Sequence, residues 1–200
     1  MKTKMFYIVL LITGIVVLQG CAGTLMPTAY VDHTEATRRA GMNRVWVADG
    51  ITLSSYQNIL VKRFSTENTK PLNSEIDISA KSAIFQAMLI GNLNGKGKNA
   101  TSDIIELPSG KPYLVVEGNM AQLNPGSRAL RYWIGFGAGR SLVEIESKAN
   151  AIQNGKNEEV AEFGVGKSRI MGVWGGDSNQ FIDEGLRDIA KRISNFICSN

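Results

Sequence analysis

The sequence predicts an α+β domain: a two-layer sandwich in which two amphipathic helices cover one face of a mainly antiparallel sheet, after an N-terminal signal peptide and tether. Two observations predict it. Several segments rich in β-branched and aromatic residues lie between clusters of Gly, Pro and Asn, as strands lie between turns. Two longer segments carry apolar residues at three- and four-residue spacing. Helices with one apolar face need a sheet face to cover, which favours two layers.

The strand predictions begin at residue 43, where the sequence Arg-Val-Trp-Val follows. Residues 43–51 and 59–64 are the first two candidates, and residues 92–102 are predicted to be a polar, glycine-rich loop. An antiparallel meander of about four strands is then expected over residues 113–123, 129–134, 142–152 and 159–165. Asn154-Gly155, before the last of these, is the strongest hairpin signal in the chain.

The two predicted helices each carry one apolar stripe. The first covers residues 74–92, where Ser74 and Asp77 resemble a capping box. Its stripe consists of Ile76, Ala80, Ala83, Ile84, Ala87 and Met88. The second begins at Asp177 or Ser178, and its stripe consists of Phe181, Ile182, Leu186, Ile189, Ile193, Phe196 and Ile197.

Residues 1–20 have the three parts of a secretory signal. Lys2 and Lys4 precede an uncharged run over residues 5–18, which is shorter than the roughly 20 residues of a membrane-spanning helix. Leu18-Gln19-Gly20-Cys21 resembles the bacterial lipoprotein signal. That resemblance implies cleavage between Gly20 and Cys21 and attachment of diacylglycerol to the Cys21 thiol. The alternative is an uncleaved anchor helix with a coincidental cysteine.

The same resemblance implies a location. Ala22 follows the cysteine where an Asp tends to retain lipoproteins at the inner membrane, so the outer membrane is expected, with the domain facing the periplasm. Membrane lipid would be the first partner, held through acyl chains on Cys21, of which stable anchoring needs at least two. Residues 21–42 are then a lipidated, flexible tether, and residues 43–200 form a single domain.

Composition excludes several classes of function. The formal charge of +4 includes Lys2 and Lys4, so the chain without its signal carries +2, and nucleic acid is not an expected partner. Cys198 is the only other cysteine, which rules out a disulfide framework once Cys21 is acylated. His33, the only histidine, lies in the tether, which argues against histidine-based catalysis and most histidine metal sites. We expect no cofactor, no metal and no enzymatic activity.

One enzymatic exception stays open, a hydrolase that uses paired carboxylates. Its candidate acids are Glu117, Glu144, Glu146 and Asp177. Glu144 and Glu146 alternate, so they are expected on one face of a strand, and we expect that face to meet water.

Two glycine-rich segments are similar to parts of nucleotide-binding motifs. Gly164-Val165-Gly166-Lys167-Ser168 lacks the earlier glycine of a phosphate loop, because Ala161 occupies that position, and no helix is expected after it. A strand ending in a glycine-rich bend is predicted instead. Residues 135–139 lack the strand–helix context of a dinucleotide fingerprint. We therefore expect no nucleotide.

A candidate interaction surface surrounds the second glycine-rich segment. Phe136 lies between glycines with Trp133 nearby, which suggests an exposed aromatic group that contacts a partner or the membrane. Basic side chains around it suit anionic head groups or an acidic protein. The surface comprises Arg128, Arg131, Trp133, Phe136 and Arg140. The alternative is a kinked hairpin with solvated charges at its turns.

Residues 123–139 also carry a family resemblance. They contain Pro-Gly-Ser-Arg, then Arg131, then Gly-Phe-Gly-Ala-Gly. This pattern is similar to the bacterial lipoprotein family called domain of unknown function 4410. The family usually has an Asp- and Gly-containing turn after the next strand, where this chain has Asn154-Gly155. The resemblance implies an envelope lipoprotein with a small α/β domain and implies no activity.

The leading functional hypothesis is therefore a lipid-anchored, non-enzymatic module that contacts another envelope protein. A second hypothesis is a subunit of an envelope assembly or secretion apparatus, similar to curli-secretion lipoproteins. A third is a small-ligand binder with a pocket lined by Trp46, Trp133 or Trp174, or the carboxylate hydrolase.

Overall fold

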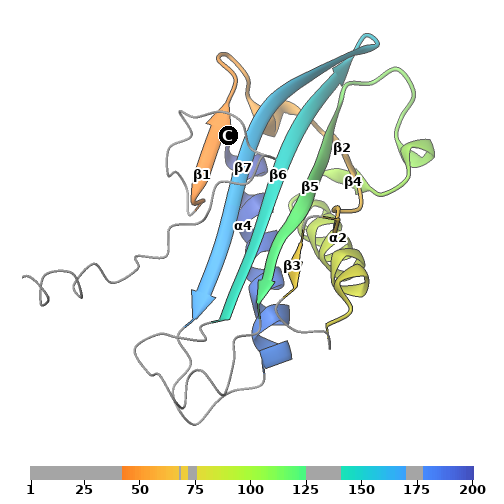
Figure 1. Ribbon diagram of the computed structural model, residues 1–200. Helices are drawn as coiled ribbons and strands as arrows, with labels where there is room; N and C mark the ends of the chain where they lie inside the picture. Colours follow the sequence, from red (N-terminus) through yellow and green to blue (C-terminus); the bar gives the residue numbers. More distant parts are fainter. Residues whose placement is uncertain (1–41, 68, 72–75, 125–140, 170–177) are drawn as a thin grey trace, which may run out of the picture.

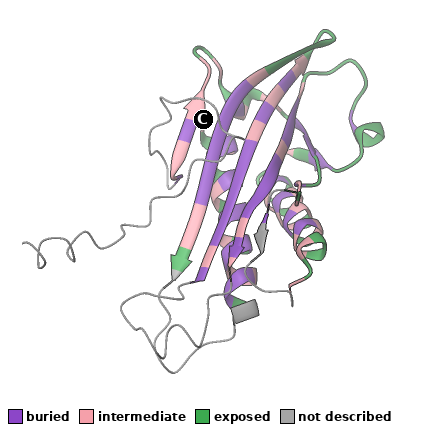
Figure 2. Ribbon diagram, viewed as in Figure 1, coloured by how far each residue is buried: buried purple, intermediate pink, exposed green. Residues whose placement is uncertain are grey.

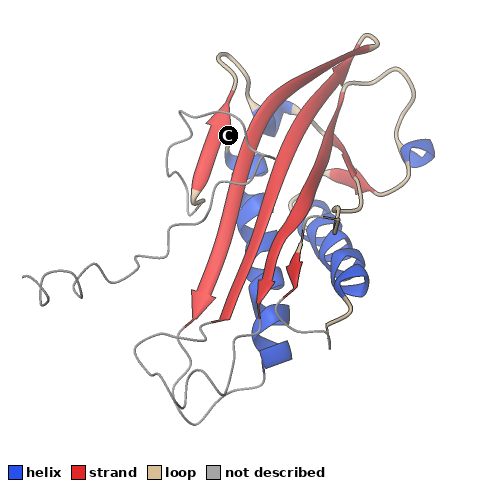
Figure 3. Cartoon of the chain, in the orientation of Figure 1, coloured by secondary structure: helices blue, strands red, loops and turns tan. Residues whose placement is uncertain are grey.

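Seven strands form one mixed sheet, and two helices pack on one of its faces (Figures 1 and 3). The computed structural model describes residues 42–67, 69–71, 76–124, 141–169 and 178–200. The strand order is β1-β7-β6-β5-β2-β4, and β3 pairs with β5. This is the predicted α+β architecture. The strands are β1 (Arg44–Val47), β2 (Asn58–Val61), β3 (Lys70–Pro71), β4 (Asn99–Thr101), β5 (Tyr113–Asn124), β6 (Ser141–Gln153) and β7 (Lys156–Arg169).

The three longest strands form the centre of the sheet. β5, β6 and β7 pair antiparallel, and β1 adds antiparallel to the outer side of β7. Asn154 and Gly155 join β6 to β7 with φ angles of 53° and 75°, as a two-residue type I′ turn requires. The predicted hairpin is confirmed. The strand expected over residues 129–134 lies outside the described residues.

The other side of the sheet is parallel. β2 lies between β4 and β5 and runs parallel to both. The helix α2 (Ile78–Asn94) carries the chain from β2 back to the start of β4, as parallel neighbours require. β4 lies in the segment predicted to be a loop, so that prediction was wrong for Asn99–Thr101. Asn99 Nδ2 donates to Asn58 Oδ1 at 3.0 Å, which links this polar edge strand to β2.

The second helix, α4 (Ser178–Ser199), lies across the sheet behind β6 and β7 in Figure 1. Its apolar stripe was predicted correctly: all seven residues from Phe181 to Ile197 in that stripe are at most 2% exposed. Phe196 packs against Phe163 of β7, with ring centroids 5.6 Å apart. Cys198, in the last turn, is half-buried against this core.

The face that α2 buries differs from the prediction. Asp77 is the N-cap, because its side chain accepts a hydrogen bond from the Ala80 amide at 2.9 Å, and the helix begins at Ile78; Ser74 of the predicted capping box lies outside the described residues. Its buried residues are Ser82, Phe85, Leu89 and Leu93, whereas Ile84 of the predicted stripe is 41% exposed. Apolar residues surround this helix, so their spacing does not select one face. Phe85 fixes the buried face by packing edge-on against Phe64, with the two ring centroids 4.8 Å apart.

Candidate functional site: the polar sheet face

The sheet face opposite the helices carries a network of charged side chains. Alternation along β6 sends Val143, Ile145 and Ala149 into the core and places Glu144, Glu146 and Lys148 on the other face. Figure 2 shows how far the central strands are buried along their length. We call this network the polar sheet face. It comprises Arg44, Lys62, Glu117, Glu144, Glu146, Lys148, Asn150, Glu159 and Glu162.

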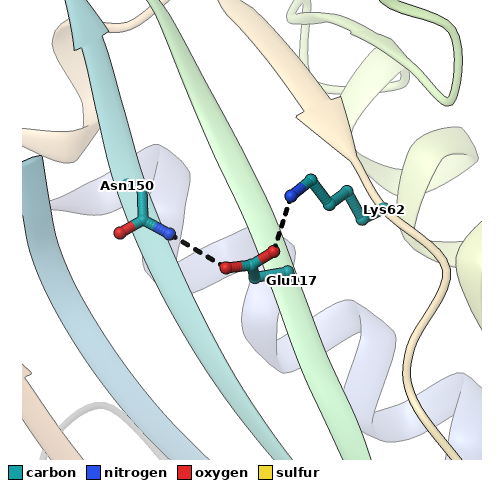
Figure 4. Close-up of polar contacts among 3 residues, drawn as sticks. All are labelled: Lys62, Glu117 and Asn150. Atoms are coloured by element: carbon teal, nitrogen blue, oxygen red, sulfur yellow. Dashed lines mark hydrogen bonds and ion pairs between the residues drawn. The ribbon is translucent and has the colours of Figure 1, made fainter. Parts of the chain in front are cut away.

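The end of the network near β2 is open to solvent. Lys62 Nζ lies 2.8 Å from Glu117 Oε2, and Asn150 Nδ2 donates to Glu117 Oε1 at 3.3 Å (Figure 4). The Lys62 side chain is 54% exposed and that of Glu117 32%. These contacts join the residue that follows β2 to β5 and β6. Water and salt screen an ion pair at this depth, so it orients side chains more than it stabilises the fold.

The network becomes buried between β6 and β7. Lys148 lies directly opposite Glu117 on one side and Glu162 on the other. Its Nζ is 3.1 Å from Glu162 Oε1 and 3.2 Å from Glu159 Oε2. Glu162 is fully buried, and Lys148 is 19% exposed. One ammonium group therefore faces two carboxylates at a place where water is largely excluded, so its single charge balances only one of them.

Burial and hydrogen bonding shift two pKa values here. Burial alone would lower the pKa of Lys148, but its hydrogen bonds to Glu162 and Glu159 outweigh burial, and the pKa is raised. The pKa of Glu159 is also raised, first by burial and then by a hydrogen bond with Glu162, against the opposing effect of Lys148. Glu159 in the folded protein therefore takes up a proton more readily than an ordinary glutamate does.

A glycine lets a fourth ion pair form across β7. Arg44 of β1 and Glu146 of β6 both lie opposite Gly164. Arg44 Nη1 is 3.9 Å from Glu146 Oε1, and Glu146 is 1% exposed. A β carbon at position 164 would lie 3.7 Å from the Arg44 β carbon. A larger side chain there would stand between the arginine and the glutamate.

The structure corrects the prediction for the two alternating acids. Glu144 and Glu146 lie on one face of β6, as predicted, but they are only 4% and 1% exposed and do not meet water. β6 is central in the meander, so side chains of β5 and β7 flank them. Glu117 is held by Lys62 and Asn150, and Asp177 lies outside the described residues. Over the described ranges, no three His, Cys, Asp or Glu side chains gather as metal ligands would.

The segment similar to a phosphate loop is a strand. Residues 164–168 belong to β7, which continues to Arg169, so the predicted bend is not at this position. Gly164 leaves room for the ion pair between Arg44 and Glu146. The Gly166 amide donates a hydrogen bond to Asn43 Oδ1 at 2.7 Å. Both glycines therefore lie within the sheet, and the bond from Gly166 uses a backbone amide that any residue except proline would also provide.

Several predicted sites lie outside the described residues. They are the lipidation and cleavage site, Gly20 and Cys21, and the interaction surface of Arg128, Arg131, Trp133, Phe136 and Arg140. The surface lies between Asn124 of β5 and Ser141 of β6 along the chain. Of the three tryptophans, Trp46 is described; it is half-buried opposite Glu162. In the part of the chain that the structure covers, none of the helices has the length and apolarity to cross a bilayer.

Comparisons with known proteins identify the family of this chain. The family model "Domain of unknown function (DUF4410)" matches residues 52–173. No curated protein matches the sequence significantly. Among solved structures, the PelC dodecamer from Paraburkholderia phytofirmans is 12% identical, with a TM-score of 0.40 over 74% of this chain and 96% of that one. A minor lipoprotein from Acinetobacter baumannii is 12% identical (TM-score 0.40; 73% and 95%), and lipoprotein GNA1162 from Neisseria meningitidis is 15% identical (0.29; 72% and 99%). Similarity at this level transfers neither assembly nor function.

Proposed function

This chain belongs to the DUF4410 family, and on that premise we propose that it is a lipid-anchored lipoprotein of the bacterial envelope whose domain is a non-enzymatic binding module. The observation that carries the proposal is Leu18-Gln19-Gly20-Cys21, at the end of a short uncharged run and about 20 residues before the folded domain. Acylation of Cys21 would hold the domain at the membrane, since two or more acyl chains give stable anchoring. Ala22 favours the outer membrane, with the domain facing the periplasm.

The anchor is tested by replacing the acylated thiol. Cys21→Ala, expressed in a Gram-negative host, is expected to leave the membrane fraction and to lose the acyl mass that the wild-type protein carries. Cys198→Ala is the matched control, because its thiol lies in the last turn of α4, and it should keep both the acyl mass and the membrane location. A wild-type protein without acyl mass, or a Cys21→Ala protein still bound to membranes, would refute the anchor.

The domain is proposed to bind another envelope protein rather than to catalyse a reaction. Two described ion pairs of the polar sheet face support this, because Glu117 and Glu146, two of the four candidate acids, lie near Lys62 and Arg44. The proposed contact surface is the segment with Trp133 and Phe136, whose aromatic and basic side chains are of the types enriched at interfaces.

The binding surface is tested by crosslinking in living cells. A photoreactive amino acid at Phe136 is expected to capture one envelope protein, identified by mass spectrometry. The same group at Arg187, an exposed position on α4, is the control and should not capture it. Equal capture from both positions, or none from Phe136, would contradict the proposed surface.

A further inference from the structure

Two adjacent isoleucines stand out from the surface of the domain. Among the described residues, three large apolar side chains are exposed: Ile84 by 41%, Ile104 by 53% and Ile105 by 86%. Ile104 and Ile105 lie in the short 3-10 turn η2 (Ile104–Glu106), in the loop between β4 and β5. That loop extends beyond the β4 edge of the sheet in Figure 1 and is largely exposed in Figure 2.

Hydrogen bonds hold this turn in one conformation. The Asp103 carboxylate accepts from the Ile105 amide at 2.9 Å, and the Asp103 amide donates to Thr101 Oγ1 at 3.1 Å. The Thr101 hydroxyl donates to the Glu106 carboxylate. Thr101 is itself buried in β4, so the sheet edge fixes the start of the turn.

The far end of the turn is fixed by an apolar side chain. Leu107 is 8% exposed and packs with Leu60 and Val115 in a small cluster of its own. Its amide donates to the Ile104 carbonyl at 3.1 Å. Thr101, Asp103 and Leu107 therefore account for the conformation of the turn. The side chains of Ile104 and Ile105 contribute little to the fold, because they point into solvent.

We propose that Ile104 and Ile105 insert into the surface of the lipid bilayer to which Cys21 anchors the chain. This inference rests on the proposed function, because the anchor is what brings the bilayer within reach. The roughly 20 residues between Cys21 and Met42 can extend to about 70 Å, whereas a domain of this size has a radius of gyration of about 15 Å. The tether therefore lets the β4 edge of the domain face the membrane.

The size of the patch favours a tethered contact. Two isoleucines are far too small for a stable protein interface, which buries about 1,200–2,000 Å² in total. Burying the exposed parts of these two side chains gives only a modest gain in free energy, because Ile104 is already about half buried. That is weak for a free protein, but it is enough when an anchor holds the domain at a high effective concentration beside the bilayer.

The chemistry of the neighbouring charges specifies the lipid. The carboxylates of Asp103 and Glu106 flank the isoleucines and would repel an anionic surface. The contact is therefore apolar, and it should form on zwitterionic lipid without added negative charge. This differs from the basic clusters through which proteins bind anionic membranes.

The test uses the full-length, acylated protein reconstituted in vesicles of phosphatidylethanolamine and phosphatidylcholine. In a Cys198→Ala background, a nitroxide label is attached at Ile105→Cys or, as the control, at Arg187→Cys on the exposed side of α4. Electron paramagnetic resonance then compares the accessibility of each label to oxygen, which concentrates in lipid, and to a nickel chelate, which stays in water. At position 105, we expect the ratio of oxygen accessibility to nickel accessibility to be severalfold higher in vesicles than in a detergent-free solution of the deacylated protein. At position 187, we expect this ratio to be the same in both.

A second variant tests the contact without a probe in it. With the label at Arg187→Cys, replacing both isoleucines by serine should make the anchored domain tumble faster, while its melting temperature stays unchanged. An acylated protein whose label at 105 stays in water would overturn this inference alone. Absence of the acyl group would instead overturn the proposed function. A label shielded from both oxygen and nickel would indicate a protein contact, which also overturns the inference.

Discussion

Gly185 of α4 lies against Val143 of β6 so closely that no side chain fits between them. A β carbon at position 185 would lie 2.9 Å from Val143 Cγ2 and 3.3 Å from its β carbon. The glycine thus sets how near the helix approaches the sheet, and the seven buried residues of the α4 stripe reach the core because of that approach.

Gly185→Ala is expected to destabilise the domain. The helix gains about 1 kcal/mol of propensity from alanine, but overpacking costs about 1–3 kcal/mol, so the net loss in the free energy of unfolding is about 1 kcal/mol. Urea unfolding measures it. Gly91→Ala on α2 is the control, because nothing lies within 4 Å of its β-carbon position and it should gain stability. Adding Val143→Ala should cost the Gly185→Ala protein less than it costs the wild type; simple additivity would show that the two residues do not touch.

A second glycine, Gly118 of β5, tolerates alanine even less. A β carbon there would overlap the Phe64 ring and the carbonyl oxygen of Glu146. The ring is buried against Phe85, and the carbonyl belongs to the central strand β6, so neither can easily move. We expect Gly118→Ala to cost about 3 kcal/mol, at the upper end for overpacking. Thermal and urea unfolding would both show it, and a cost below that of Gly185→Ala would contradict the close packing.

The two helices show what periodicity can and cannot predict. In α4, charged residues such as Asp183 and Lys191 occupy one side, so only one face can be apolar, and the predicted stripe is the buried one. In α2, alanines and isoleucines surround the helix, and several registers of the stripe fit the sequence equally well. Contact with Phe64, which is 21 residues before Phe85 in the chain, selects the face. The spacing of apolar residues along the sequence does not reveal that contact.

The polar sheet face depends on a register that the sequence does not show. Counting back from the Asn154-Gly155 turn with Gln153 opposite Lys156, Lys148 would lie opposite Ala161. A bulge between Ala149 and Asn150 shifts the pairing by one residue and places Glu162 opposite Lys148 instead. The alternating charges can be read in the sequence, but the buried pair of Lys148 and Glu162 depends on the bulge. Glu144 and Glu146 were expected in water for another reason: their spacing shows a shared face of one strand, but it does not show that strands on both sides flank that face.

Burial should make two lysines of the same face differ sharply in their effect on stability. Lys148→Met leaves the fully buried Glu162 without this ammonium partner, and we expect a loss of about 3–5 kcal/mol near neutral pH. Lys62→Met removes a lysine that is 54% exposed, and we expect a loss below about 1 kcal/mol. Urea unfolding of the two variants makes the comparison; equal losses would argue against a buried charge network.

The pH dependence of the Lys148→Met effect follows from the raised pKa of Lys148. A lysine with a raised folded-state pKa contributes its full stabilisation below its ordinary value of 10.5 and loses it as the pH rises through the folded-state pKa. The difference between wild type and Lys148→Met should therefore shrink in strong alkali. A difference that stays constant from neutral pH to above that pKa would show that lost packing, and not lost charge, causes the effect.

Glu159 should make the domain less stable as the pH rises from acid. Its folded-state pKa is raised above the ordinary value of 4.5, first by burial and then by the hydrogen bond with Glu162, so the folded state holds the proton more tightly than the unfolded state. The stability that this proton provides is complete below 4.5 and is lost as the pH rises through the folded-state pKa. Glu159→Gln carries no such proton, so its stability relative to wild type should rise over that interval and then level off.

A double variant separates this titration from the loss of an ion pair. Burial and the hydrogen bond with Glu162 raise the pKa of Glu159, whereas Lys148 lowers it. Without the lysine, that pKa is therefore raised further. In a Lys148→Met background, the gain from Glu159→Gln should therefore be larger and should level off at a higher pH. Urea unfolding at a series of pH values from 3 to 9 measures both curves. If Glu159→Gln instead loses stability relative to its parent as the pH rises, the ion pair with Lys148 outweighs burial, and the raised pKa assigned to Glu159 is wrong.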